Sequence, residues 1–202
     1  MNPHTPLLYP NNLPVSQALQ IFFDKYHFAD GGYNLKWFHI KVGFINIPLP
    51  NTKSRVEVAK IHDIHHILTG YEATLRGEAE IAGWEIASGC DHYGVAWFFN
   101  LGSFFYGMFF FPKSLFNAFL RGCKVKTNYY HLHYPYPQML SKTVGEMRTE
   151  VDPLSASDSP APVLKDYFHF IFYILCVMLI AISVICLVEL TLRGIYAQLF
   201  SV

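Results

Sequence analysis

The chain has 202 residues, enough for one domain with a hydrophobic core and an appendage but not for two ordinary soluble domains. Its 15 basic and 15 acidic side chains leave no net charge, which argues against a nucleic-acid or other polyanionic partner. Hydrophobic residues make up 52% and aromatic residues 17%, a composition that points toward a membrane. The four cysteines show no C-x-x-C spacing, so neither a disulfide framework nor a zinc knuckle is expected, as in a reducing compartment.

The N-terminal quarter of the chain predicts one helix followed by an extended segment. The first 14 residues lack both a charged start and an apolar stretch, so no signal peptide is expected. Apolar residues recur at helical spacing from Val15 to Phe28. Residues 34–47 alternate only partly between apolar and polar, which fits a short strand or an irregular extended stretch. The prolines of residues 48–51 are expected to break the chain before the next helix.

The strongest functional signal lies in the stretch HDIHHILTGYEATLRGE. His62 and His66 are four positions apart, so on a helix both imidazoles share one face and could reach the same metal ion. Asp63 lies about 100 degrees round from His62, where it could bind at the edge of that face or orient a ligand. Gly70 predicts the end of this helix. A second helix, for which Thr74 is a suitable N-cap, would then bring Glu78 back toward the histidines.

A solvated polar helix face, with Glu78 as an unrelated surface charge, is the simplest alternative. It is disfavoured by an apolar stripe beside the histidines, which consists of Val58, Ile61 and Leu68. The stripe places the imidazoles at a core boundary, where polar groups need partners. His65 is offset from His66 and is expected to pack, or to support a ligand, rather than to bind the ion. Glu85 lies on nearly the same helix face as Glu78 and is either a supporting carboxylate or an exposed surface residue.

Residues 92–111 form an aromatic, glycine-rich stretch of about the length of a membrane span. Its three glycines and Asn100 argue against a full span, so we expect a half-buried helix that forms a lipid-accessible wall, with an aromatic core helix as the alternative. Four basic residues follow it, namely Lys113, Arg121, Lys124 and Lys126. They could meet anionic head groups. His131 and His133 lie in a proline-rich loop and are weak ligand candidates.

The C-terminal part predicts a single transmembrane anchor. Residues 151–165, rich in Pro, Ser and Asp, predict a linker between a helical metal-binding domain (1–150) and an anchor with a short tail (166–202). The 19 residues from Phe170 to Val188 include one clearly polar side chain and would span about 28 Å as a helix. Basic residues concentrate before this span, whereas only Arg193 follows it. This bias predicts a single-pass protein of the inner or cytoplasmic membrane with its main domain on the cytoplasmic side.

The pattern His62, Asp63, His66 and Glu78, with eleven residues between the last two, resembles the signature of the coenzyme Q (ubiquinone) biosynthesis protein 4 family. The resemblance extends to four further residues, Gly70, Gly77, Trp84 and Glu85, and covers about residues 15–150. The C-terminal span departs from the better-known members, which are peripheral membrane proteins, and the segment from 31 to 51 suggests a bacterial-type branch.

The resemblance implies a mainly helical, all-α fold with a divalent ion bound at these four positions. It also implies work on a polyprenylated aromatic quinone precursor at the membrane lipid surface, together with other ubiquinone-biosynthesis enzymes. One view of the family assigns it an oxidative decarboxylation in which the C1 carboxyl of a hydroxybenzoate-type ring is replaced by hydroxyl. The other view makes it a non-catalytic scaffold that binds prenyl lipid and organises the pathway enzymes.

The residues themselves favour metal chemistry. Two histidines and one carboxylate, from Asp63 or Glu78, suit iron(II) or a catalytic zinc ion, and the remaining carboxylate could be a further ligand or a general acid and base. We therefore expect a metal-dependent decarboxylase, with a structural four-ligand zinc site in a scaffold as the main alternative. The sequence leaves a homo-oligomer open.

Two other metal enzymes use histidines in related patterns. His62, His65 and His66 match the H-x-x-H-H box of membrane hydroxylases, but the further boxes and spans of that class are missing from the sequence. A phosphohydrolase with adjacent His and Asp ligands would have to recruit two distant residues, His39 and either Asp91 or Asp152. Both assignments are disfavoured.

Overall fold

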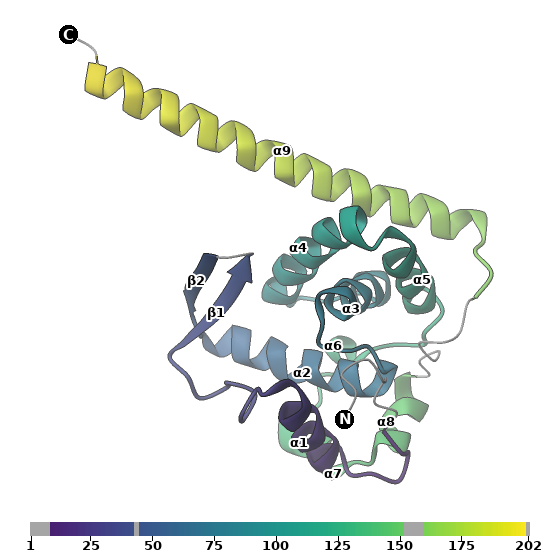
Figure 1. Cartoon of the computed structure of the whole chain (residues 1–202). Coiled ribbons are helices and arrows are strands. Elements are labelled where there is room, and N and C mark those ends of the chain that lie inside the picture. The colour runs from purple at the N-terminus through teal and green to yellow at the C-terminus, as the bar shows by residue number, and fades with distance from the viewer. Residues whose placement is uncertain (1–8, 43–44, 152–159, 201–202) are drawn as a thin grey trace. The chain divides into compact units, whose positions relative to one another are not determined.

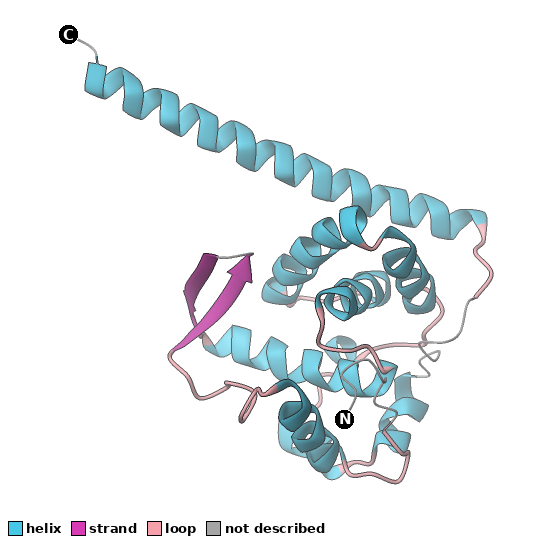
Figure 2. Cartoon of the chain, in the orientation of Figure 1, coloured by secondary structure: helices cyan, strands magenta, loops and turns pink. Residues whose placement is uncertain are grey.

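The structure is a computed structural model that describes residues 9–42, 45–151 and 160–200. It divides into two compact units, residues 1–161 and 162–202, each of which is described by itself. Residues 152–159, which include most of the expected linker and Asp152, lie outside the described residues. The fold is mainly helical, as expected, with one small sheet (Figure 2).

The first unit contains eight described helices and a two-stranded antiparallel hairpin. The helices are α1 (Val15–Tyr26), α2 (Lys53–Thr69), α3 (Leu75–Ser88), α4 (Gly94–Phe110), α5 (Pro112–Gly122), α6 (Tyr129–Leu132), α7 (Tyr136–Ser141) and α8 (Val144–Val151). The strands are β1 (Trp37–Val42) and β2 (Ile45–Pro50).

The hairpin corrects one expectation from the sequence. The prolines of residues 48–51 were expected to break the chain, but Pro48 and Pro50 belong to β2, where Pro48 pairs with His39 and Pro50 with Trp37. Proline lacks a backbone N–H, which an edge strand tolerates because half of its groups face away from the partner strand. In a sheet of only two strands, both strands are edges.

Local signals place α2 and α3 as the sequence predicts. Gly70 ends α2 with φ 79°, a left-handed conformation that glycine adopts without strain. Thr74 caps α3 by accepting a hydrogen bond from the Gly77 N–H at 3.1 Å. A Cβ at Gly77 would lie 1.8 Å from the carbonyl oxygen of Glu72, so the turn between the two helices needs glycine there. Together these residues set a short connection that turns Glu78 toward α2.

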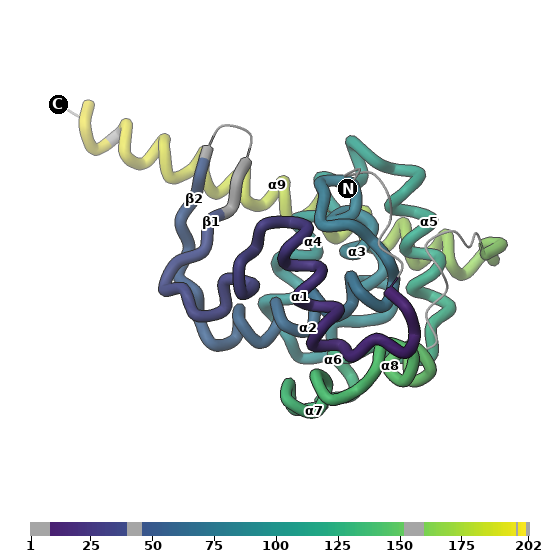
Figure 3. Tube along the Cα trace, turned by 60° about the horizontal axis from the view of Figure 1, so that its bottom comes forward, coloured from purple at the N-terminus to yellow at the C-terminus, as the bar shows by residue number. Residues whose placement is uncertain are grey.

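The helices of the first unit form two layers around one core. Helix α3 packs against α4 and α5 on one side of the core, and α1 lies against α2 and α7 on the other (Figures 1 and 3). The largest fully buried side chains include Trp84, Tyr129, Tyr130, Phe22, Phe104, Phe119, Ile64 and Ile67. Burial of each such side chain contributes about 1.5–3 kcal/mol, which makes this core the main source of stability.

Helix α4 is half-buried, as predicted for residues 92–111. Its buried residues recur at helical spacing and are Ala96, Asn100, Phe104 and Gly107. The opposite face exposes Phe98, Phe109 and Phe110. Contact of this face with lipid stays a prediction. Pro112 opens α5 at its first turn, where its missing N–H leaves no hydrogen bond unmade.

The second unit is one helix, α9 (Leu164–Phe200), of 37 residues (Figure 2). It contains the predicted span from 170 to 188 and starts within the segment predicted as linker. Among the described residues, it is the one helix that is both long and apolar enough to cross a membrane.

Candidate metal centre

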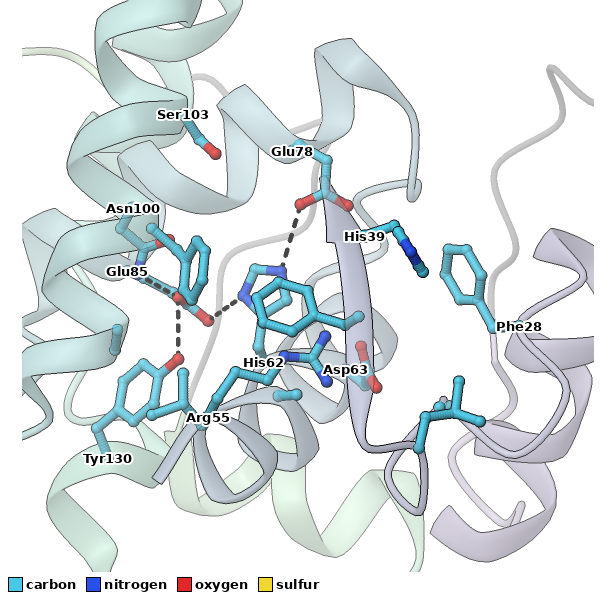
Figure 4. Close-up of a pocket in the computed structure, with 18 of the residues that line it drawn as sticks. Phe28, His39, Arg55, His62, Asp63, Glu78, Glu85, Asn100, Ser103 and Tyr130 are labelled. Atoms are coloured by element: carbon cyan, nitrogen blue, oxygen red, sulfur yellow. Dashed lines mark hydrogen bonds and ion pairs between the residues drawn. The ribbon is translucent and has the colours of Figure 1, made fainter. Parts of the chain in front are cut away.

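Three of the four predicted ligands, His62, His66 and Glu78, converge on one point. Figure 4 shows the contact between His62 and Glu78. His62 Nε2 lies 3.1 Å from His66 Nε2 and 3.4 Å from Glu78 Oε2, and His66 Nε2 lies 3.4 Å from Glu78 Oε1. Donor atoms bound to one ion at 2.0–2.1 Å lie about 3.0–3.4 Å from one another. The separations within this His62 cluster (His62, His66 and Glu78) therefore match those of a shared divalent ion.

The second ring nitrogen of each histidine fixes its orientation. His66 Nδ1 lies 3.0 Å from the carbonyl oxygen of Tyr71, which can only accept, so Nδ1 carries the hydrogen and Nε2 keeps its lone pair. His62 Nδ1 lies 3.0 Å from Glu85 Oε1, and the same reasoning applies. The two Nε2 atoms thus face each other as acceptors and need a cation between them, either a proton or a metal ion. This chemistry of the donor set fits a metal centre.

The charges around His62 show what holds the cluster in its metal-free form. Desolvation disfavours a charged imidazole, but the neighbouring carboxylates Glu85 and Glu78 outweigh it and raise the pKa of His62 well above 6.5. Desolvation likewise disfavours a charged Glu78, yet His66 and His62 hold the pKa of Glu78 below its ordinary value. A metal ion would take the place of a proton that these groups already stabilise.

Glu85 is fully buried rather than exposed, and it supports the cluster from below. Its Oε1 accepts from His62 Nδ1 at 3.0 Å and from His65 Nδ1 at 2.7 Å. Its Oε2 accepts from Tyr130 Oη at 3.1 Å and from Asn100 Nδ2 at 2.5 Å. These four donors occupy both oxygens, so Glu85 can orient His62 but is not free to act as a metal ligand. Figure 4 shows its contacts with His62, Asn100 and Tyr130.

His65 does not face the point at which the donor atoms of the His62 cluster converge. It is fully buried, and its Nε2 accepts the backbone N–H of Tyr129 at 3.1 Å while Nδ1 donates to Glu85. Both ring nitrogens are therefore used, as expected for a histidine that supports a ligand. The hydroxylase box, which needs His65 as a ligand, has no counterpart in this geometry.

Asp63 is the predicted ligand that lies apart from the other three. Its Oδ2 accepts a hydrogen bond from Tyr33 Oη at 2.5 Å, and no oxygen of Asp63 joins the group of donor atoms within 4.8 Å of one another. Desolvation raises the pKa of Asp63. In this conformation Asp63 ties the loop before β1 to α2 rather than completing the donor set.

The His62 cluster opens into a cavity of about 440 Å³ in the first unit. Aromatic and apolar side chains form much of its wall, namely Phe28, Leu35, Trp37, Phe38 and Phe99. Glu78, whose side chain is 39% exposed, borders this space, whereas His66 is 1% exposed. The donor set is therefore open to the cavity. A catalytic ion needs such an open position, whereas a structural zinc site is closed.

Arg55 is the one arginine among the described residues that line this cavity. Its guanidinium carbon lies 4.3 Å from the centroid of the Phe38 ring, and its Nη1 lies 3.3 Å from Asn51 Oδ1. Desolvation lowers the pKa of Arg55. Within the described part of the chain, no carboxylate pairs with it at 4.0 Å or less. Figure 4 shows the guanidinium directed toward His62 and Asp63.

Sequence reasoning did not single out Arg55, Tyr130 or the role of Asn100. Arg55 precedes His62 by seven positions, which places both on one helix face two turns apart, and that spacing was a usable signal. Asn100 is a polar residue in an aromatic helix, and its partner is Glu85. No local pattern links Tyr130 to the cluster.

The residues that a phosphohydrolase site would need are not gathered. His39 lines the cavity, but Asp91 belongs to a separate group with His92 and His133. His131 contacts the carbonyl oxygen of Ser88 at 3.2 Å.

Comparison of the chain with protein-family models, curated proteins and solved structures finds no match.

Proposed function

We propose that the first unit is a metal-dependent enzyme of ubiquinone biosynthesis. Its reaction would be the oxidative decarboxylation of a polyprenylated hydroxybenzoate-type precursor, with the C1 carboxyl replaced by hydroxyl and with zinc or iron(II) as cofactor. In balanced form, the carboxylic acid, water and dioxygen give the phenol, carbon dioxide and hydrogen peroxide. The observation that supports it best is the His62 cluster, which presents three converging donors to an aromatic-walled cavity.

The residues of the cavity divide the work as follows. His62, His66 and Glu78 would hold the divalent ion, which when bound supplies Lewis-acid stabilisation of negative charge on the ring oxygen. Arg55 would hold the substrate carboxylate, because a guanidinium offers two parallel donors that match its two oxygens. Phe38 stacks against that guanidinium and would restrict its orientation.

The apolar wall suits the rest of this substrate. The flat faces of Phe28 and Phe99 would contact the aromatic ring. Leu35 and Trp37 line the same cavity and are 60% and 54% exposed, so a prenyl chain that leaves the cavity beside them would bury apolar surface. A membrane-bound precursor agrees with α9 as a single membrane span. In this proposal, the first unit works on the cytoplasmic side with other enzymes of the pathway.

The metal assignment is tested by His66→Ala and Glu78→Ala in a strain that lacks the endogenous gene. Both variants should fail to restore the quinone and should accumulate a ring that still carries its carboxyl. His27→Asn, at an exposed position with φ 58° that asparagine accepts, is the matched control and should restore it fully. Full restoration by either alanine variant would exclude the metal chemistry.

The role of Arg55 is tested separately with Arg55→Met, which keeps much of the apolar stem. The purified variant should bind zinc as the wild type does but lose at least about tenfold in affinity for a carboxylated aromatic compound such as 4-hydroxybenzoate carrying a short prenyl chain. Equal affinity for the carboxylated compound and its decarboxylated analogue in the wild type would contradict the assignment.

The scaffold alternative has one observation in its favour, the exposed aromatic face of α4. Phe98, Phe109 and Phe110 are 69%, 58% and 68% exposed, and such a face could hold prenyl lipid without turnover. A scaffold predicts that purified metal-loaded protein leaves a carboxylated precursor unchanged. Release of carbon dioxide by the purified protein alone would exclude it.

A further inference from the structure

We propose that Asp91, His92 and His133 form a second metal site, suited to a zinc ion, on the surface of the first unit. This Asp91 cluster joins the loop between α3 and α4 to the residue that follows α6. The proposal does not depend on the reaction assigned to the His62 cluster.

The donor atoms of the Asp91 cluster already point toward one another. Asp91 Oδ2 lies 2.8 Å from His92 Nδ1 and 3.0 Å from His133 Nε2, and all three donor atoms lie within 4.8 Å of one another. The two imidazole rings stack with centroids 5.2 Å apart and an interplanar angle of 28°. Two stacked rings thus direct one nitrogen each to the same carboxylate oxygen, which brings three donors of the kind that zinc prefers to one place.

The backbone holds two of these residues in a conformation that L-residues seldom adopt. Asp91 has φ 46° and His133 has φ 51°, both in the left-handed region. Such a conformation is uncommon for residues other than glycine, and aspartate and histidine are among those that adopt it more often. The chain accepts it at two of the three donor residues, from segments far apart in the sequence.

Exposure decides what kind of ion site this is. The side chains of His92, His133 and Asp91 are 66%, 51% and 30% exposed, so water can complete the coordination of an ion held by three protein donors. Imidazole with carboxylate favours zinc over calcium or magnesium, which prefer oxygen donors alone. The Asp91 cluster would therefore be an exposed metal site that links two segments, rather than a buried centre.

A chain of side-chain contacts connects the Asp91 cluster to the His62 cluster. Tyr93 stacks on His92 with ring centroids 4.3 Å apart and lies 5.3 Å from the ring of Tyr130. Tyr130 in turn donates to Glu85, which orients His62. An ion at the Asp91 cluster would hold the loop that carries Tyr93 and so restrict the movement of Tyr130 beneath Glu85.

The test uses the full chain in detergent, stripped of metal, and titrates zinc against a chromogenic chelator. The wild type should bind two equivalents. A His66→Asn, Glu78→Gln double variant should keep one equivalent, and adding His133→Asn should remove it, since asparagine keeps the left-handed backbone. His92→Gln, which leaves φ at residue 133 untouched, should remove it as well, and His27→Asn should not.

Two results would overturn the second site. The first is a double variant that binds no zinc, and the second is an equivalent of zinc that persists after both His133→Asn and His92→Gln. Circular dichroism and the unfolding temperature show whether each variant is folded, and the single His92→Gln variant in an otherwise intact chain should fall from two equivalents to one. Loss of enzymatic activity plays no part in this measurement, so failure of the proposed reaction leaves it interpretable.

Discussion

The His62 cluster and the Asp91 cluster contain the same three donors, two imidazoles and one carboxylate, yet the protein builds them differently. In the His62 cluster, the nitrogen that faces away from the ion is hydrogen-bonded to Glu85 or to the Tyr71 carbonyl. In both clusters the histidines contact the carboxylate that would itself bind the ion, but among the described residues no hydrogen bond holds the second ring nitrogen of His92 or His133. Supporting residues, rather than donors, distinguish a preorganised centre from a surface site, and the former should bind zinc more tightly.

Removal of the support should have the largest effect. Glu85→Gln keeps the size of the side chain but replaces one acceptor oxygen by an NH₂ group. That group would face two donors, either those of His62 and His65 or those of Asn100 and Tyr130. We expect zinc affinity at the His62 cluster to fall by about 10–100-fold and the free energy of unfolding to fall by about 1–3 kcal/mol. Zinc titration and urea unfolding measure the two effects.

The matched control for this change is Glu80→Gln, on the same helix, whose carboxylate pairs with the exposed Arg76. It should leave both measurements close to those of the wild type. Zinc affinity that is the same in Glu85→Gln and Glu80→Gln would show that the buried carboxylate does not preorganise the site.

A change beside the donor set, with no donor lost, should have the next largest effect. Gly77→Ala places a Cβ against the Glu72 carbonyl, so the turn before α3 must move and Glu78 with it. We expect a loss of about 1–3 kcal/mol in the free energy of unfolding and weaker zinc binding at the His62 cluster only. Gly102→Ala, where a Cβ meets nothing within 4 Å, should be neutral or slightly stabilising.

The metal-free protein should show a stability maximum in mildly acidic solution. Desolvation disfavours a charged Glu85, but His62 and His65 outweigh it and lower its pKa below 4.5, so its contribution is present above pH 4.5 and is lost as the pH falls through the lowered pKa. The raised pKa of His62 gives a contribution that is present below pH 6.5 and is lost as the pH rises through the raised value.

Urea unfolding of chelator-treated protein across this pH range measures the loss of stability on both sides of the maximum, the acid limb and the alkaline limb. Glu85→Gln should flatten them together, because the same carboxylate raises the pKa of His62. A wild-type stability that climbs without a break from pH 5 to pH 8, under about the same salt, would contradict the assigned charges.

The smallest effect is expected at the exposed cluster. The hydrogen bond from His92 lowers the pKa of Asp91, and histidines 133 and 131 add to this, but the carboxylate lies where water and salt screen it. Asp91→Asn should leave the acid limb of the metal-free protein unchanged while it removes one equivalent of zinc. If Asp91→Asn shifted the acid limb as much as Glu85→Gln does, the carboxylate of Asp91 would contribute to stability as the buried Glu85 does, and the contrast between the two clusters would be wrong.

The sequence predicted the parts of the site that local rules control. The spacing of His62 and His66, the helix end at Gly70 and the cap at Thr74 all depend on residues within one or two turns. The burial of Glu85 could not be decided in this way, because the four donors to its carboxylate all come from other helices, α2, α4 and α6.

The Asp91 cluster shows the same limit more sharply. Asp91 and His133 meet only because α4, α5 and α6 lead the chain back to the loop after α3. Asp and His adopt the left-handed conformation more often than most residues, but too rarely for the sequence to predict it at these two positions. The prediction that the prolines of β2 break the chain was wrong for a related reason. Proline is tolerated in an edge strand, and whether a strand is an edge depends on the whole sheet.

The length of α9 bears on how the chain would sit in a bilayer. At 1.5 Å per residue a helix of 37 residues is about 55 Å long, whereas the hydrocarbon layer is about 30 Å thick. A helix of this length that crossed a bilayer would have to tilt or project well into the polar layers. Glu189 pairs with Arg193 one turn later, and in such a span this ion pair would suit the head-group boundary.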